Sequence, residues 1–162
     1  SRIVTSNDLV KRFIDPKAHV SHNSGEHEWY TPPGIISAAR VALGGIDLDP
    51  ASCAEANDIV YADRYYVAET NGLEQPWAGT VWLNPPYSQP ITLTNNGTET
   101  DYGQSLLLWC DSICFPAKRI RFTNGDGEST GSPLQGQMIC YFGPDRDRFA
   151  TAFVEFGVVI NA

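Results

Sequence analysis

A chain of 162 residues, with 42% hydrophobic and 19% charged residues, is long enough to bury one core and is typical of a globular domain. Its formal net charge of −8 argues against a general nucleic-acid binder, because phosphate contacts require clustered cations. The sequence contains no apolar run that could cross a membrane, and its first residues lack the apolar core of a signal peptide. The four cysteines show no C-x-x-C spacing, so we expect reduced thiols in a cytosolic protein.

The first half of the chain predicts a polar arm over residues 1–27, followed by a single domain over residues 28–162. Pro32-Pro33 indicates the start of a helix, and Gly44-Gly45 indicates its end. Residues 46–49 alternate in polarity and predict a strand. Asp49 before Pro50 predicts the N-cap of a helix that runs to about residue 57. Further strands are predicted at 59–61 and 81–83.

The second half continues the alternation of strands and helices. Strands are predicted at 91–93, 113–115, 119–122, 138–142 and 158–160, helices at 100–110 and 146–156, and a loop at 123–133. This order predicts an α/β fold with a doubly wound sheet.

The strongest chemical signal is the tetrapeptide Asn84-Pro85-Pro86-Tyr87, which follows the apolar run 81–83. An adenine amine is a poor nucleophile, and acceptors around its two hydrogens favour the tetrahedral form that can attack a sulfonium methyl group. The Asn84 side-chain oxygen and the Pro85 carbonyl can be those acceptors, and two prolines fix the backbone. Tyr87 offers a face on which a flipped base can stack. The alternative is a plain proline-rich turn.

The second signal is the segment 45–52, where alternation sends Ile46 and Leu48 to one side and the carboxylates of Asp47 and Asp49 to the other. One carboxylate can hold the ammonium of a methionine moiety while the other orders the turn, and Asp49 can equally be a helix cap. A metal site is the weaker alternative, because the three histidines lie in the polar arm without ligand spacing.

A third signal is the basic stretch Lys118-Arg119-Ile120-Arg121, which can contact DNA phosphates or can be the solvated side of a strand.

Together with Glu28-Trp29-Tyr30-Thr31-Pro32, these motifs resemble the phage-type DNA N-6-adenine methyltransferase family, the Dam-like phage enzymes. The matching stretches are 28–32, 46–52, 62–66, 71–73, 82–88, 93–96, 113–116 and 134–137. The resemblance implies a Rossmann-like class I methyltransferase with a doubly wound mixed sheet and S-adenosylmethionine as cofactor. It also implies double-stranded DNA as the partner and the cytoplasm of a bacterial host as the place of action. We expect a monomer without metal.

By this resemblance, the cofactor-binding candidates are Trp29, Tyr30, Thr31, Pro32, Asp47, Asp49, Asn71 and Asn84. The segment 29–32 and Asp47 would line the methionine end of the cofactor, and Asn71 would lie near its adenine. The DNA-binding candidates are Asn95, Asn96, Lys118, Arg119, Arg121 and Gln137.

One feature departs from the family: only residues 88–90 separate Tyr87 from the predicted strand at 91–93. A parallel neighbour normally requires a crossover of a dozen or more residues. Either a segment is omitted near residues 89–91 or the pairing of that strand is abnormal, and we favour omission, with a chain break there. Two other functions stay open: an amino-methyltransferase acting on protein glutamine or RNA, and a catalytically silent cofactor- or DNA-binding module.

Overall fold

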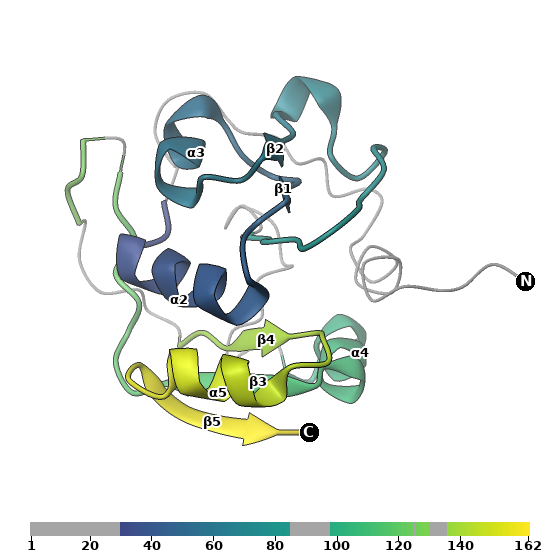
Figure 1. Cartoon of the computed structure of the whole chain (residues 1–162), viewed down its shortest axis with the longest axis vertical. Helices are drawn as coiled ribbons and strands as arrows, with labels where there is room; N and C mark the ends of the chain where they lie inside the picture. The colour runs from purple at the N-terminus through teal and green to yellow at the C-terminus, as the bar shows by residue number, and fades with distance from the viewer. Residues whose placement is uncertain (1–29, 85–97, 125, 130–135) are drawn as a thin grey trace, which may run out of the picture.

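The computed structural model describes residues 30–84, 98–124, 126–129 and 136–162 (Figure 1). Its helices are α2 (Pro33–Leu43), α3 (Ala54–Val60), α4 (Asp101–Trp109) and α5 (Arg146–Phe153), with a short 3-10 helix at Ala68–Thr70. Its strands are β1 (Leu48–Asp49), β2 (Arg64–Tyr65), β3 (Ser112–Pro116), β4 (Ile139–Tyr141) and β5 (Gly157–Asn161). The predicted arm, the strand at 91–93 and the predicted chain break lie outside the described residues.

The described strands form two small sheets. In the first, β1 pairs in parallel with β2, and Leu48 also makes a parallel bridge to Val81 on its other edge. In the second, β3 lies between β4 and β5 and is antiparallel to both. The predicted α/β class is therefore confirmed, with a parallel and an antiparallel part.

Helix α2 lies between the two sheets and contributes to both cores (Figure 1). Pro33 occupies its first turn, and Gly44 ends it in the left-handed conformation at φ 74°, as the sequence predicts. Ile36 packs with Ile46, Val60 and Ala62 beside the parallel sheet. Helix α2 thus ties the β1 region to the rest of the domain.

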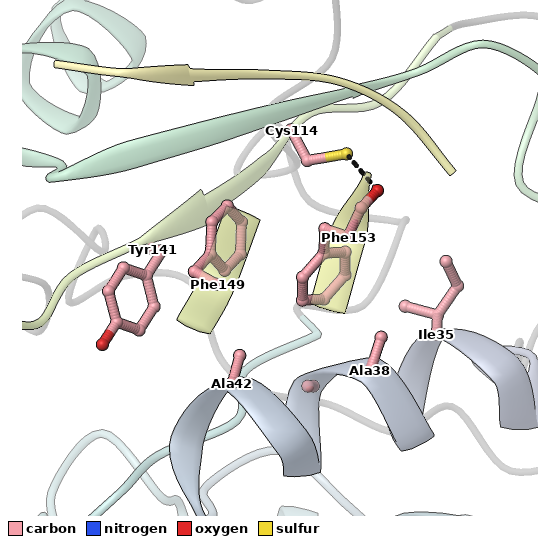
Figure 2. Packing of buried hydrophobic residues seen from close by; sticks show 8 residues of the cluster. Ile35, Ala38, Ala42, Cys114, Tyr141, Phe149 and Phe153 are labelled. Atoms are coloured by element: carbon pink, nitrogen blue, oxygen red, sulfur yellow. Dashed lines mark hydrogen bonds between the residues drawn. The ribbon is translucent and has the colours of Figure 1, made fainter. Parts of the chain in front are cut away.

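The larger core lies between α2, α5 and the antiparallel sheet (Figure 2). The rings of Tyr141 and Phe149 stack with centroids 4.9 Å apart, and those of Phe149 and Phe153 lie 4.6 Å apart. The small side chains of Ala38 and Ala42 on α2 face these rings and let the two helices approach closely. Cys114 of β3 is fully buried in the same core.

Two predictions around α3 are wrong. Residues 59–61 are the end of α3 and not a strand, because Val60 packs as the last helical residue and Tyr61 turns the chain at φ 52°. Two hydrogen bonds from the Arg40 guanidinium to the Val60 and Tyr61 carbonyls close this helix end. The N-cap of α3 is Cys53, whose Sγ accepts a hydrogen bond from the Ala56 amide, and not Asp49.

Other predicted elements differ in extent. Residues 119–122 form no strand; the following residue, Thr123, makes isolated bridges to Tyr30 and Ser129. The segment 81–83 pairs with β1 only around Val81, and α5 ends at Phe153. Across the described residues, no helix has the length and hydropathy needed to cross a bilayer. All four cysteines are free thiols.

Candidate active site

Three parallel segments end side by side at the carboxyl end of β1. The Arg64 and Tyr66 amides donate to the carbonyls of Asp47 and Asp49, which holds β2 on one edge. On the other edge, the Trp82 amide donates to the Leu48 carbonyl over 3.0 Å. Asn84 is half-buried and follows Trp82 by two residues. The structure therefore places Asn84 at the same end of the sheet as Asp49, while Pro85, Pro86 and Tyr87 lie outside the described residues.

Asp49 is a buried carboxyl at this end, with only 3% of its surface exposed. Its Oδ1 accepts a hydrogen bond from the Ala51 amide over 3.2 Å. Burial raises the pKa of Asp49 to about 7, and the Ala51 amide and the Ser52 side chain offset only part of that effect. Within the described residues, no lysine or arginine forms an ion pair with it. The site therefore contains an acidic group that a cationic ligand would stabilise in its ionised form.

Asp47 lies before β1 and faces a different partner. Its Oδ2 accepts a hydrogen bond from the Thr80 amide over 2.8 Å, and its own amide donates to the Thr80 carbonyl over 2.9 Å. The two carboxylates of the segment 45–52 thus have distinct surroundings: Asp47 is bound to the turn at 79–80, and Asp49 is buried at the strand's carboxyl end.

Asn71 reaches this end of the sheet through a close backbone contact. A Cβ on Gly72 would overlap the Pro50 carbonyl oxygen, so only glycine allows the 71–72 turn to lie against the turn that follows β1. The Asn71 Oδ1 atom is buried and accepts no hydrogen bond from any described residue. An unsatisfied buried acceptor costs about 1–3 kcal/mol, which a ligand donor would recover.

Tyr30 and Thr31 are buried, and Tyr30 contacts the N-cap residue of α3. The Tyr30 hydroxyl lies 3.7 Å from the Cys53 Sγ, at hydrogen-bonding distance for sulfur. Pro32 follows and precedes α2, and its carbonyl accepts hydrogen bonds from the first turn of that helix. Trp29 lies outside the described residues. The structure therefore brings Tyr30 to Cys53, in the stretch of chain that follows Asp49.

The predicted DNA-binding residues are placed less completely. Lys118, Arg119 and Arg121 are exposed on the irregular segment after β3. That segment leads to Thr123, whose amide and carbonyl both bond to the backbone of Tyr30, at 3.1 and 2.8 Å. Gln137 is half-buried two residues before β4, whereas Asn95 and Asn96 lie outside the described residues.

Two contributors escaped sequence reasoning. Cys53 is an uncommon N-cap residue, and the sequence around it contains no capping pattern that would predict this role. Gly72 permits the approach of the 71–72 turn, and its position directly after Asn71 was the available signal for a tight turn. Among the described residues, no three His, Cys, Asp or Glu side chains are grouped as metal ligands.

Comparison with known proteins identifies the family of the chain. Residues 17–106, more than half of the chain, match the family model for DNA N-6-adenine-methyltransferase (Dam). The DNA N-6-adenine-methyltransferase of Escherichia phage T1 is 41% identical over 73 residues, which are 44% of this chain and 29% of the phage protein. No solved structure matches. The match spans less than a third of the length of the phage T1 relative. Because the family model matches more than half of the chain, the chain belongs to the DNA N-6-adenine-methyltransferase (Dam) family.

Proposed function

We propose that the chain transfers a methyl group from S-adenosylmethionine to the N-6 amine of adenine in double-stranded DNA. The observation that carries this proposal is the convergence of Asp49, Asn71 and Asn84 at one end of the parallel strands. Open α/β sheets bind their ligands at the carboxyl ends of the strands. Membership of the Dam family and the name of the phage T1 relative support the reaction and its acceptor.

The fold of this proposal is a Rossmann-like class I methyltransferase with a doubly wound mixed sheet. The parallel pairing of β1 with β2 and with the segment around Val81 supports one half of such a sheet. The antiparallel order β4-β3-β5 supports the other half. Helix α2 lies between the two and contacts both cores.

The described residues fit the cofactor in two ways. The Asp49 carboxyl is buried without a cationic partner among the described residues, and the ammonium of the methionine moiety would supply one. The Asn71 Oδ1 atom is a buried acceptor, and an adenine amine would donate to it. The contact between the Tyr30 hydroxyl and Cys53 supports the assignment of the segment 29–32 to the methionine end of the cofactor. When bound, S-adenosylmethionine supplies the electrophilic methyl group on sulfur.

The catalytic group is the loop Asn84-Pro85-Pro86-Tyr87. The Asn84 side-chain oxygen and the Pro85 carbonyl would accept hydrogen bonds from the two amine hydrogens of adenine and so localise the nitrogen lone pair, to which the bound cofactor would supply its methyl group. Pro86 would restrict the backbone of this loop. Tyr87 stacks on the flipped base, which a duplex must extrude before its amine can react.

We assign the DNA surface to the basic segment Lys118, Arg119 and Arg121, and we assign further DNA contacts to Asn95, Asn96 and Gln137. All three cations are exposed, and the Tyr30–Thr123 backbone pair joins their segment to the cofactor end of the site. Concentrating cations in this way lets a chain of net charge −8 contact phosphates locally. We place its action, as a monomer, in the cytoplasm of a bacterial host.

The test is incubation of the protein with methyl-labelled S-adenosylmethionine and duplex DNA, RNA or bacterial protein in separate reactions. Label is expected in DNA and not in RNA or protein. Incorporation into RNA or protein would replace the proposed acceptor. Cofactor binding without any incorporation would indicate a catalytically silent module.

A further inference from the structure

Thr80 is bonded to the start of β1 through its backbone and its side chain. Its amide donates to Asp47 Oδ2 over 2.8 Å, and its carbonyl accepts from the Asp47 and Leu48 amides at 2.9 and 3.1 Å. Its hydroxyl donates to the Gly45 carbonyl over 2.9 Å and accepts from the Asp47 amide over 3.2 Å. We call this set of hydrogen bonds between Thr80 and residues 45–48 the Asp47–Thr80 clasp.

The absence of a side chain at Gly79 leaves space for the Asp47 carboxylate. It has φ 76°, a conformation that side chains rarely adopt, and a Cβ at this position would overlap the carboxylate of Asp47. The sequence Gly79-Thr80 therefore provides both the space and the donor that the carboxylate uses.

The clasp bears on the register of residues 80–82 against β1. Thr80 is followed by Val81, Trp82 and Leu83, which are consecutive apolar residues and are all half-buried. A slip by one residue would exchange one apolar side chain for another, so hydrophobic burial specifies the register of this segment only weakly. The same slip would turn Asn84 to the opposite face of the sheet. The polar bonds of the clasp are specific for one register.

We propose that Asp47 is a positioning residue: through the Asp47–Thr80 clasp it fixes the register of residues 80–82 against β1 and thereby the face on which Asn84 is presented. This assigns the Asp47 carboxylate to the strand that carries the catalytic loop and leaves Asp49 to the cofactor. The consequence for turnover rests on the proposed function, whereas the clasp itself does not.

The first experiment compares Asp47→Ala with Asp47→Asn, because asparagine keeps an oxygen that can accept from Thr80 but removes the charge. We expect Asp47→Ala to lower kcat by about tenfold or more, with the cofactor Kd and the KM for DNA changed less than about threefold. Asp47→Asn should retain most of kcat. If the carboxylate instead bound the cofactor ammonium, both variants would weaken cofactor binding by a similar large factor, and the proposal would be overturned.

The second experiment measures amide hydrogen exchange by NMR and needs no activity. The reporter is the Trp82 amide, which bonds to the Leu48 carbonyl, and the reference is β3. We expect Asp47→Ala to speed Trp82 exchange by about tenfold while β3 is unchanged, and Asp47→Asn to leave both unchanged. Unchanged Trp82 exchange, or equal acceleration in β3, would refute a local clasp.

Two further variants sharpen the comparison. Gly79→Ala would place a methyl group in the space that the Asp47 carboxylate occupies, and it should reproduce the hydrogen-exchange pattern of Asp47→Ala. Asp58→Ala removes an exposed carboxylate from α3 and should leave turnover and exchange as in the wild-type protein. If the wild-type protein labels no DNA, the proposed function fails while hydrogen exchange still decides whether the clasp exists.

Discussion

Replacing Asp49 by asparagine should stabilise the folded protein at neutral pH and at the same time abolish cofactor binding. Burial raises the pKa of Asp49 to about 7 in the folded state, against an ordinary value of 3.8. Between these values the folded protein holds a proton that the unfolded chain has released, so stability falls as the pH rises through this window. Above pH 7 the folded protein retains the full cost of a buried carboxylate.

The magnitude follows from the difference between the two pKa values. At about 1.4 kcal/mol for each pH unit, this cost is about 4 kcal/mol. Asparagine does not titrate, and it keeps an oxygen for the Ala51 amide. Its buried NH2 group adds a cost of its own, roughly 1–3 kcal/mol if unsatisfied, but that cost does not vary with pH. The difference in unfolding free energy between variant and wild type should therefore change by about 4 kcal/mol between pH 4 and pH 8.

Urea unfolding followed by circular dichroism at several pH values between 4 and 8 measures this difference. The matched control is Asp58→Asn, which makes the same substitution at an exposed position of α3. The same samples report cofactor binding through the rise in melting temperature with S-adenosylmethionine, which Asp49→Asn should lose. Parallel pH curves for Asp49→Asn and wild type would show that the buried carboxyl is not protonated as described. An unchanged melting shift would remove Asp49 from the cofactor site.

Other substitutions test other parts of the account. Asn84→Ala should lose most turnover while the cofactor Kd stays within about threefold, as measured by label transfer and calorimetry, and a wild-type rate would end its catalytic assignment. Replacing Arg119 and Arg121 with alanine should weaken DNA binding for every sequence and reduce the slope of log K against log salt by about 2; an unchanged slope would move the DNA surface elsewhere. Phe153→Ala should lower the unfolding free energy in urea by about 3–5 kcal/mol, because its ring is 1% exposed in the core, and a loss under about 1 kcal/mol would contradict that packing.

Local signals in the sequence predicted much of the fold. Helix α2 begins and ends where its prolines and glycines indicate, since capping depends on a few adjacent residues. Helices α4 and α5 and strands β3, β4 and β5 also lie where their patterns place them, with ends shifted by up to three residues. Each of α5, β3 and β4 contributes a buried apolar side chain to the larger core, namely Phe149 and Phe153, Cys114, and Tyr141.

The errors arise where tertiary contacts decide between local alternatives. The triplet 59–61 is β-branched and aromatic, which favours a strand, but Val60 packs under α2 as the last residue of a helix. Residues 119–122 alternate in polarity like a strand, yet the bridges to Tyr30 and Ser129 form at the neighbouring Thr123 and not within this segment. Propensity cannot report the presence or absence of such a partner.

The contacts around the candidate site residues could not be predicted from the sequence. Alternation identified Asp47 and Asp49 as a pair, but the sequence contains no sign that Thr80, far along the chain, would bind one of them. The burial of Asp49 and the unsatisfied oxygen of Asn71 likewise depend on turns that meet only in the folded protein. The placements of Trp29 and of Pro85 to Tyr87 stay predictions, because these residues lie outside the described part of the chain.

Methyl transfer to the N-6 amine of adenine can be tested through the chemical identity of the product. Duplex DNA without prior methylation is incubated with the protein and S-adenosylmethionine and is then digested to nucleosides. The nucleosides are separated by liquid chromatography and identified by mass spectrometry. We predict that the wild-type reaction yields N6-methyldeoxyadenosine and that the Asn84→Ala reaction yields no methylated nucleoside. A methyl group on cytosine, or unmodified DNA from a protein that binds the cofactor, would contradict this prediction.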